Sequence, residues 1–143
     1  MTANVFIDTN ILIYAHNQQD AEKYRVANAR LLEFWAGNGA ILSVQVLQEF
    51  YVNAIRVFPR PLTAMQARQI VADYAPWAVP VTPERVLEAV DLSSRHHFSF
   101  WDSLILAWAI AAGAEVLLTE DLTHGRVIEG VRIENPFLTA AAG

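Results

Sequence analysis

Short apolar runs alternate along this chain with longer amphipathic stretches, which is the pattern of strands separated by helices. The first run, Val5–Ile7, is apolar on both faces and is therefore typical of a strand buried inside a parallel sheet. Pro80 interrupts a later run and predicts an edge strand or a strand end there. The predicted strands are Val5–Ile7, Ala40–Leu42, Trp77–Val81, Val116–Leu118 and Val131–Ile133.

Capping residues and glycines delimit the segments between these strands. Asp20, Ser43 and Ser99 each stand at the start of a predicted helix, and the two serines are predicted caps. Thr63 with Gln66 forms a capping-box pattern, and Thr82-Pro83-Glu84 has the favoured order of cap, proline and acid. Gly125 and Gly130 bracket a predicted loop before the last strand. The predicted helices cover residues 11–15, 20–36, 44–58, 63–74, 82–96 and 99–113.

Strands that alternate with helices predict an α/β fold, in which helices flank a central, mainly parallel sheet of four to five strands. The chain has 143 residues, without an internal repeat or a linker. This length is enough for one domain with a real core and short of what two domains usually need. We therefore expect a single domain over residues 1–143.

Composition and charge narrow the possible functions. The hydrophobic fraction of 54% is high for a small domain, so we expect an apolar surface that a partner covers. There is no cysteine, which excludes disulfides, thiol catalysis and cysteine metal sites. The longest apolar run, Leu104–Ala114, is too short to span a membrane, and Asp8 interrupts any signal-peptide pattern. We expect a soluble protein of the cytoplasm, without a membrane partner.

The formal net charge of −5 argues against binding nucleic acid through a broad positive field. Lys23 is the only lysine, and the other cationic side chains are arginines. Any contact with a phosphate would then be local, through a few arginines or a metal ion. Arg56 and Arg60 are the candidates by position, although Arg56 could equally pair with Glu49 or be solvated.

Four acidic residues stand at comparable places in the predicted fold. Asp8 and Asp121 each follow a strand, at the sheet edge where α/β folds bind ligands. Glu49 lies on the polar face of the helix after the second strand, and Asp102 lies at the start of an otherwise apolar, buried helix. Glu120, beside Asp121, is expected to be the solvated neighbour.

Each of these acids also has an ordinary structural explanation. Asp8 can cap a helix, Asp102 can interact favourably with a helix N-terminus, and Asp121 can belong to a surface turn. Glu49 can be a solvated side chain. Their joint placement favours a site of oxygen ligands, and such a site suits Mg²⁺ or Mn²⁺.

Four sequence blocks combine these acids with their neighbours: Phe6–Asn10, Ser43–Phe50, Phe100–Ile105 and Leu118–Asp121. In this order and spacing they resemble the blocks of the PIN-domain ribonucleases, and within that family those of the VapC-type toxins of toxin–antitoxin pairs. The resemblance extends over nearly the whole chain, and the ending Asn135-Pro136-Phe137 also resembles the tail of that family. It implies a three-layer PIN-like fold.

The resemblance also implies an activity and its residues. The acids of the family's site carry over as Asp8, Glu49, Asp102 and Asp121, which would bind Mg²⁺ or Mn²⁺. Three other residues are implied as supporting groups: Thr9 and Thr119 as hydroxyls near the metal, and Asn10 as the group that orients Asp8. The implied reaction is hydrolysis of single-stranded or looped RNA by metal-activated water. The implied partners are an antitoxin and a second copy of the chain.

Other functions fit the sequence less well. An aspartate-based phosphoacceptor domain usually needs a lysine near the phosphoryl group, and Lys23 lies within a predicted helix. A dinucleotide-binding domain would show a glycine-rich turn after a strand, which is absent. A non-catalytic α/β binding module remains the main alternative. We leave His16, His96 and His97 out of the site, and expect most of the tryptophans to lie in the core.

Overall fold

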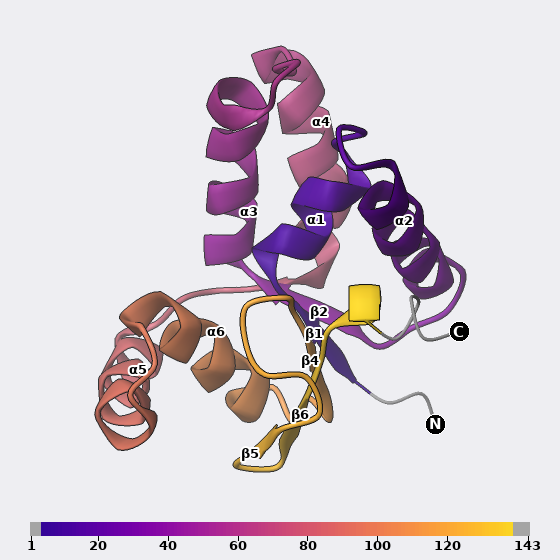
Figure 1. The fold of residues 1–143 in the computed structure, drawn as a ribbon. Helices are drawn as coiled ribbons and strands as arrows, with labels where there is room; N and C mark the ends of the chain where they lie inside the picture. The colour runs from indigo at the N-terminus through magenta and orange to yellow at the C-terminus, as the bar shows by residue number, and fades with distance from the viewer. Residues whose placement is uncertain (1–3, 139–143) are drawn as a thin grey trace.

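The computed structural model describes residues 4–138, which form one six-stranded sheet with helices on both sides (Figure 1). The strand order is β3-β2-β1-β4-β6-β5, and every neighbouring pair is parallel except β5 with β6. The predicted α/β fold with a mainly parallel sheet is confirmed. The strands are β1 (Val5–Ile7), β2 (Ala40–Ser43), β3 (Ala78–Val79), β4 (Val116–Leu118), β5 (Val127–Ile128) and β6 (Val131–Glu134).

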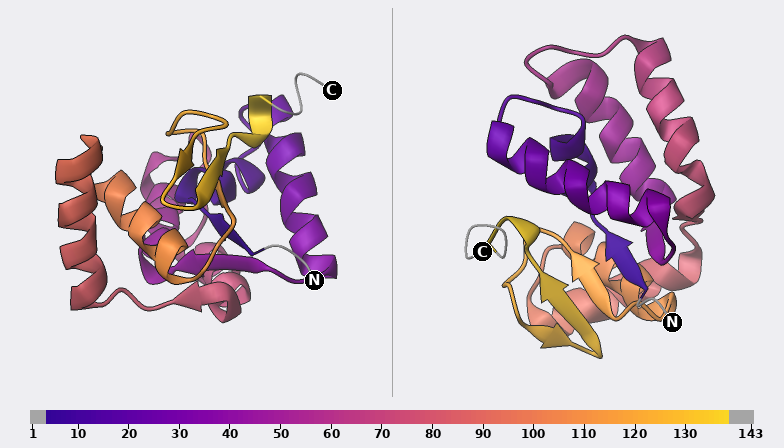
Figure 2. Two further views of the ribbon diagram at one scale, coloured as in Figure 1. Left: turned by 90° about the horizontal axis from the view of Figure 1, so that it is seen from below. Right: turned by 90° about the vertical axis from the view of Figure 1, so that its right-hand side faces the viewer.

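The helices form three groups around these strands. The helix α1 packs against α2, α3 packs against α4, and α5 packs against α6. The pair α5 and α6 lies on the opposite side of the strands from α2 (Figure 2). None of the helices within residues 4–138 is both long and apolar enough to cross a membrane. The helices are α1 (Thr9–Ala15), α2 (Ala21–Ala36), α3 (Val44–Val52), α4 (Ala64–Tyr74), α5 (Pro83–His96) and α6 (Phe100–Ala111).

The strand β1 lies in the middle of the sheet because its residues are apolar on both faces. Phe6 and Ile7 are fully buried, between β2 on one side and β4 on the other. Each such side chain removed from water stabilises the fold by about 1.5–3 kcal/mol. Ile7 pairs with Leu118 of β4, so these two parallel strands end side by side.

The predicted capping residues are found where the sequence indicated them. Ser43, Thr82 and Ser99 accept backbone hydrogen bonds at the starts of α3, α5 and α6, and Asp20 does so at the start of α2. Thr63 and Gln66 form the expected reciprocal capping box at the start of α4. The starts of the helices that follow β2 and β3 were therefore predictable from local chemistry.

Two segments differ from the predictions. The helix expected over residues 44–58 is α-helical only to Val52, and a π-helical turn, Asn53–Val57, completes it. The strand expected over residues 77–81 is a 3₁₀ turn, Ala75–Trp77, followed by the two-residue edge strand β3. Pro80 explains the early end of β3, since it lacks a backbone N–H to pair.

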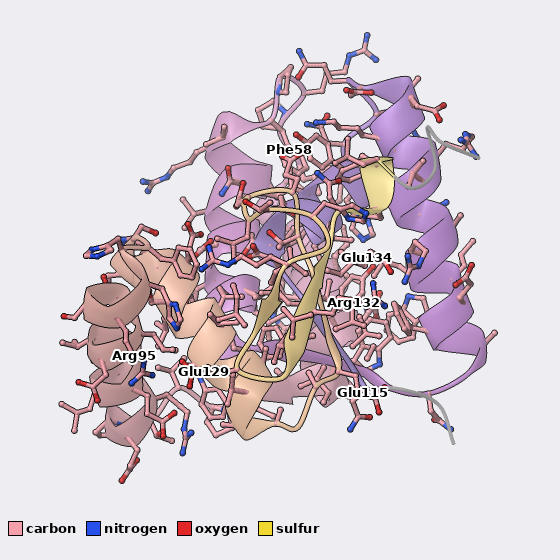
Figure 3. All side chains as sticks on the ribbon, turned by 60° about the horizontal axis from the view of Figure 1, so that its bottom comes forward. Phe58, Arg95, Glu115, Glu129, Arg132 and Glu134 are labelled. Carbon is pink, nitrogen blue, oxygen red and sulfur yellow. The ribbon has the colours of Figure 1, made fainter. Side chains whose placement is uncertain are left out.

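The sheet also has one strand more than predicted. The segment expected as a loop contains β5, which pairs antiparallel with β6 around a turn at Glu129 and Gly130. Both turn residues have positive φ angles, 49° and 90°, as a tight hairpin turn requires. Arg95 of α5 contacts the Glu129 carboxylate at 2.9 Å (Figure 3). His96 of the same helix contacts this carboxylate at 3.0 Å, so the hairpin is tied to α5.

Candidate active site

A single pocket of about 610 Å³ contains all four acidic residues singled out in the sequence. We call it the acidic pocket. It opens where β1, α1, α3, α6 and the segment after β4 meet. No lysine, arginine or histidine is among the residues of the described chain that line it. The lining residues are Asp8, Thr9, Asn10, Ile13, Gln45, Gln48, Glu49, Asn53, Trp101, Asp102, Ile105 and Asp121.

The fold brings these acids together from four separate elements. Asp8 follows β1, and its backbone N–H donates to the carbonyl oxygen of Leu118, at the end of β4, across 3.1 Å. Asp121 comes shortly after that strand end, so the adjacent parallel strands deliver both carboxylates to one edge. Glu49 lies on α3, directly after β2, which is the other neighbour of β1. Asp102 lies in the first turn of α6.

Asp8 is buried and held by two hydrogen bonds. Its Oδ1 accepts from the backbone N–H of Thr9 at 2.7 Å, and its Oδ2 accepts from Thr119 Oγ1 at 2.7 Å. The first of these bonds caps α1, so the ordinary structural explanation of Asp8 is correct as well. The orientation of the Asp8 carboxylate in the pocket is thus fixed by one hydrogen bond to each oxygen.

Glu49 is held by neighbours on α1 and α3. Thr9 Oγ1 donates to Glu49 Oε2 at 3.0 Å, and Gln45 Nε2 donates to Glu49 Oε1 at 2.5 Å. Asn53, one helical turn further along, donates its side-chain N–H to the Glu49 backbone carbonyl at 2.8 Å. Since Thr9 also contacts Asp8 through its backbone, it links the two carboxylates.

Asn10 contacts Asp121 and not Asp8, contrary to the role expected for it. Its Nδ2 donates to Asp121 Oδ2 at 3.0 Å and approaches Thr119 Oγ1 at 3.4 Å. Asn10 lies in the first turn of α1, on the side that faces the segment after β4. It therefore positions the acid of the neighbouring strand, while Thr119 and the Thr9 backbone position Asp8.

Asp102 differs from the other three acids in its contacts. Its backbone N–H donates to Ser99 Oγ at 3.1 Å, which caps α6. Within residues 4–138 its carboxylate makes no hydrogen bond or ion pair. Its negative charge reaches Asp121 across the pocket, where it raises the pKa of that carboxyl.

The electrostatics of the pocket reflect crowded negative charge. The pKa of Asp8 is raised to about 7: burial is the largest cause, the charges of Asp121 and Glu49 act in the same direction, and the hydrogen bonds from Thr119 and Thr9 oppose the rise. The pKa of Asp121 is raised by burial first and then by Asp102, while the hydrogen bond from Asn10 opposes the rise. The pocket thus lacks a compensating positive charge.

The residues present fit a divalent cation in their chemistry. Four carboxylates without a cationic side chain among them are the oxygen donors that Mg²⁺ and Mn²⁺ prefer. In residues 4–138, no three acidic or histidine side chains are already gathered closely enough to hold an ion. Hydrogen bonds to Thr9, Gln45, Asn10 and Thr119 hold the carboxylate oxygens instead, so binding an ion would exchange some of these bonds.

Comparison with known proteins identifies the family. The sequence profile of the PIN domain matches residues 5–129. The chain belongs to the PIN domain family. The match covers all four of the sequence blocks described above. A comparison with curated proteins found no match.

Solved PIN-like structures share the fold of this PIN domain. One is the VapC20 toxin of Mycobacterium tuberculosis, which cleaves the sarcin–ricin loop (20% identity, TM-score 0.64, 82% of this chain and 90% of that chain). A second is a toxin–antitoxin complex from Klebsiella pneumoniae (22% identity, TM-score 0.67, 93% of this chain and 98% of that chain). A third is VapBC2 from Rickettsia felis, bound to a DNA fragment from its promoter (20% identity, TM-score 0.65, 92% of this chain and 97% of that chain). At these identities the likeness is one of fold.

Two further predictions, one about Glu120 and one that most of the tryptophans lie in the core, are wrong for this PIN domain. Glu120 is not a free, solvated acid: its carboxylate accepts from Lys23 Nζ at 2.8 Å and from the Tyr14 hydroxyl at 2.8 Å. Trp101 is not a core residue, because 63% of it is exposed at the rim of the acidic pocket. Trp35 is also largely exposed, whereas Trp108 is buried as expected.

The sequence contained a signal for some pocket residues that were missed. Gln45, Glu49 and Asn53 form a stripe with a spacing of four along one helix face, and that whole stripe lines the pocket. Arg56 continues the stripe in the sequence but is not part of the lining, since the π-helical turn changes the helical phase from Asn53 onward. No comparable pattern indicated Gln48 or Trp101.

The remaining basic residues lie outside the acidic pocket. His16 contacts the Tyr74 hydroxyl, and His96 contacts Glu129. Arg56 and Arg60 are exposed and make no ion pair with a described residue, so Arg56 does not neutralise Glu49. Lys23 pairs with Glu120 and lies outside the pocket lining, which removes the support for a phosphoacceptor domain.

Proposed function

We propose that this PIN domain is a metal-dependent endoribonuclease, which hydrolyses RNA phosphodiester bonds as the toxin of a toxin–antitoxin pair. The observation that carries the proposal is the acidic pocket, in which four carboxylates from four elements line one cavity without a cationic side chain. We assign Asp8, Glu49, Asp102 and Asp121 as ligands of Mg²⁺ or Mn²⁺. The family profile over residues 5–129 supports this assignment.

The residues around the carboxylates have a positioning role in this proposal. Thr119 and the Thr9 N–H hold Asp8, Thr9 Oγ1 holds Glu49, and Asn10 holds Asp121. Groups that orient metal ligands are commonly needed for full affinity and activity. A bound divalent ion would supply positive charge at the scissile phosphate and a more acidic water molecule. No side chain of the pocket needs to act as a nucleophile.

Substitution of single carboxylates tests the ribonuclease proposal. Asp8→Asn and Asp102→Asn keep the side-chain shape and remove a negative charge, so each should abolish RNA cleavage while thermal melting stays cooperative. Asp91→Asn is the matched control, because Asp91 is exposed on α5, away from the pocket. Cleavage that is equal in wild-type protein and both pocket variants would overturn the assignment.

Metal binding tests the same site without an activity assay. Calorimetric titration of Mn²⁺ into the wild-type protein should show saturable binding, and Asp102→Asn should weaken it strongly. The alternative of a non-catalytic binding module would gain if neither protein bound Mn²⁺. Titrations with Mg²⁺ and Mn²⁺ in parallel would assign the ion and the number of ions bound.

The proposed partners are an antitoxin and a second copy of the chain, within the cytoplasm. An apolar groove of about 430 Å³ between α3 and α4 supports a protein partner, and Gln48 lines both this groove and the acidic pocket. The solved complexes with the same fold include toxin–antitoxin pairs. The reading frame next to the gene should encode a small protein that inhibits cleavage when co-expressed. Failure of any such protein to inhibit would leave a free-standing nuclease.

A further inference from the structure

Trp101 is an exposed aromatic side chain at the rim of the acidic pocket. It occupies the second position of α6, beside Asp102, and 63% of it is accessible to solvent. Its one aromatic contact in the described chain is an edge-type contact with Phe100, at a centroid distance of 5.2 Å and an interplanar angle of 80°. Within residues 4–138, no ring is therefore stacked on its indole.

The other exposed tryptophan of the chain is arranged differently. The centroid of the Trp35 ring lies 4.1 Å from that of Trp77 and 5.1 Å from that of Tyr74, both in tilted geometry, so its indole packs against neighbouring rings. The exposed part of Trp35 is the outer side of a cluster of aromatic rings. Exposure of Trp101, in contrast, leaves a large flat apolar surface free beside the four carboxylates.

The lining of the pocket lacks any positive charge that would hold a polyanion. Its uncharged part combines apolar side chains, Ile13, Ile105 and Trp101, with the amide side chains of Gln48 and Asn53. Flat apolar surfaces and amides suit a nucleobase, which has two π faces and an edge of hydrogen-bonding groups. Contacts to bases can thus supply affinity where contacts to phosphates are scarce.

We propose that Trp101 is the platform on which an unpaired RNA base stacks while the adjoining phosphate lies at the carboxylates. The inference rests on the proposed ribonuclease function and adds to it a residue that binds a base of the substrate. A base can stack on Trp101 only if it is turned out of a helix, so the substrate is single-stranded or looped RNA at this nucleotide. Stacking favours a purine over a pyrimidine, because a purine covers more of the indole.

Direct binding tests the platform separately from catalysis. Fluorescence anisotropy of a labelled single-stranded RNA is measured in the Asp8→Asn background, where the strand stays intact. Adding Trp101→Leu should raise Kd about 5- to 100-fold, whereas Trp101→Phe should change it by less than about 3-fold. Leu87→Ala, an exposed apolar change on α5, is the control and should leave Kd unchanged. Equal Kd for the leucine variant and its parent overturns the proposal.

The form of the RNA provides the second test. An abasic nucleotide at the cleaved step should weaken binding to the parent protein and should leave binding to the Trp101→Leu variant unchanged. A duplex of the same sequence should bind about 10-fold more weakly or worse, because its bases are already stacked. If Trp101→Leu alters the oligomeric state in size-exclusion chromatography and leaves RNA binding unchanged, Trp101 is a protein contact and the proposal is wrong. Absence of cleavage by the wild-type protein, with these binding results intact, would refute the ribonuclease proposal alone.

Discussion

Thr119 Oγ1 donates a hydrogen bond of 2.7 Å to Asp8 Oδ2, although the two residues lie 111 positions apart in the sequence. The same hydroxyl oxygen accepts the backbone N–H of Asp121 at 3.1 Å. Thr119 is buried, so water does not compete for either bond. Through these two hydrogen bonds, the Thr119 side chain links Asp8, which follows β1, to Asp121, which follows β4.

Replacement of this hydroxyl should weaken the proposed metal site. Thr119→Val keeps the volume and removes the donor to Asp8, so we expect Mn²⁺ affinity to fall about 10- to 100-fold, the usual effect of losing such a positioning group. Thr119→Ser retains the hydroxyl and should keep most of the affinity. Calorimetry at pH 8 measures both variants. Wild-type affinity in the valine variant would show that Asp8 needs no support from Thr119.

Without metal, the free energy of unfolding should fall as the pH rises from the ordinary pKa of Asp8 to its raised pKa in the folded protein. Its pKa is raised from 3.8 to about 7 in the folded protein, so the folded state holds a proton that the unfolded state has lost. The stabilisation from this proton is complete below pH 4 and is lost toward pH 7, and the free energy of unfolding falls by about 1.4 kcal/mol per pH unit in between. Urea unfolding in EDTA measures this: from pH 5 to pH 7, the free energy of unfolding should fall more for the wild-type protein than for Asp8→Asn.

The control for that experiment is the addition of Mg²⁺ at pH 7. An ion bound to Asp8 should restore stability to the wild-type protein and much less to Asp8→Asn. A difference in unfolding free energy between the two proteins that stays constant from pH 5 to pH 7 would contradict the raised pKa of Asp8.

The contact between Lys23 and Glu120 should contribute to stability next to the pocket. Lys23 Nζ lies 4.6 Å from the centre of the Tyr14 ring as well as 2.8 Å from the Glu120 carboxylate. We expect Lys23→Met and Glu120→Gln each to cost about 1 kcal/mol, and the double variant to cost less than the sum. Chemical denaturation measures all three. The exposed pair Arg25 and Glu22 is the matched control, and its removal should leave stability unchanged.

Arg56 and Arg60 should bind RNA through phosphates, independently of sequence. Both are exposed and without an ion pair to any described residue. Substitution of either by Gln should weaken binding of all single-stranded RNAs alike and reduce the slope of log K against log salt by about 0.7. Arg25→Gln on α2 is the comparison. An unchanged slope in both variants would exclude these arginines from the RNA surface.

Local chemistry made much of the fold predictable. The buried run Val5–Ile7 specified the central strand, and hydroxyl or carboxylate caps such as Ser43 and Thr82 specified where helices begin. Carboxylates after two strands of a parallel sheet could be expected at one edge, and Asp8 and Asp121 do meet there. These predictions succeeded because each depends on neighbours in sequence or on a general property of parallel sheets.

Features that depend on tertiary neighbours were not predictable. The pairing of Glu120 with Lys23 requires knowing that α2 passes beside the end of β4, and the contact of Asn10 with Asp121 requires the same of α1. The π-helical turn at Asn53 has no signature in one sequence. The exposure of Trp101 depends on which part of α6 remains uncovered, and an apolar residue in an apolar helix gives no sign of that.

The central position of β1 has a consequence for how the protein is made. One flanking strand, β2, follows within 40 residues, but the other, β4, is among the last strands to leave the ribosome. During translation the nascent chain can therefore carry Asp8 and Glu49 long before Asp102 and Asp121 exist. A stalled or truncated product that lacks β4 also lacks Asp121 and the strand that brings it beside Asp8, so the complete set of carboxylates forms only as synthesis nears its end.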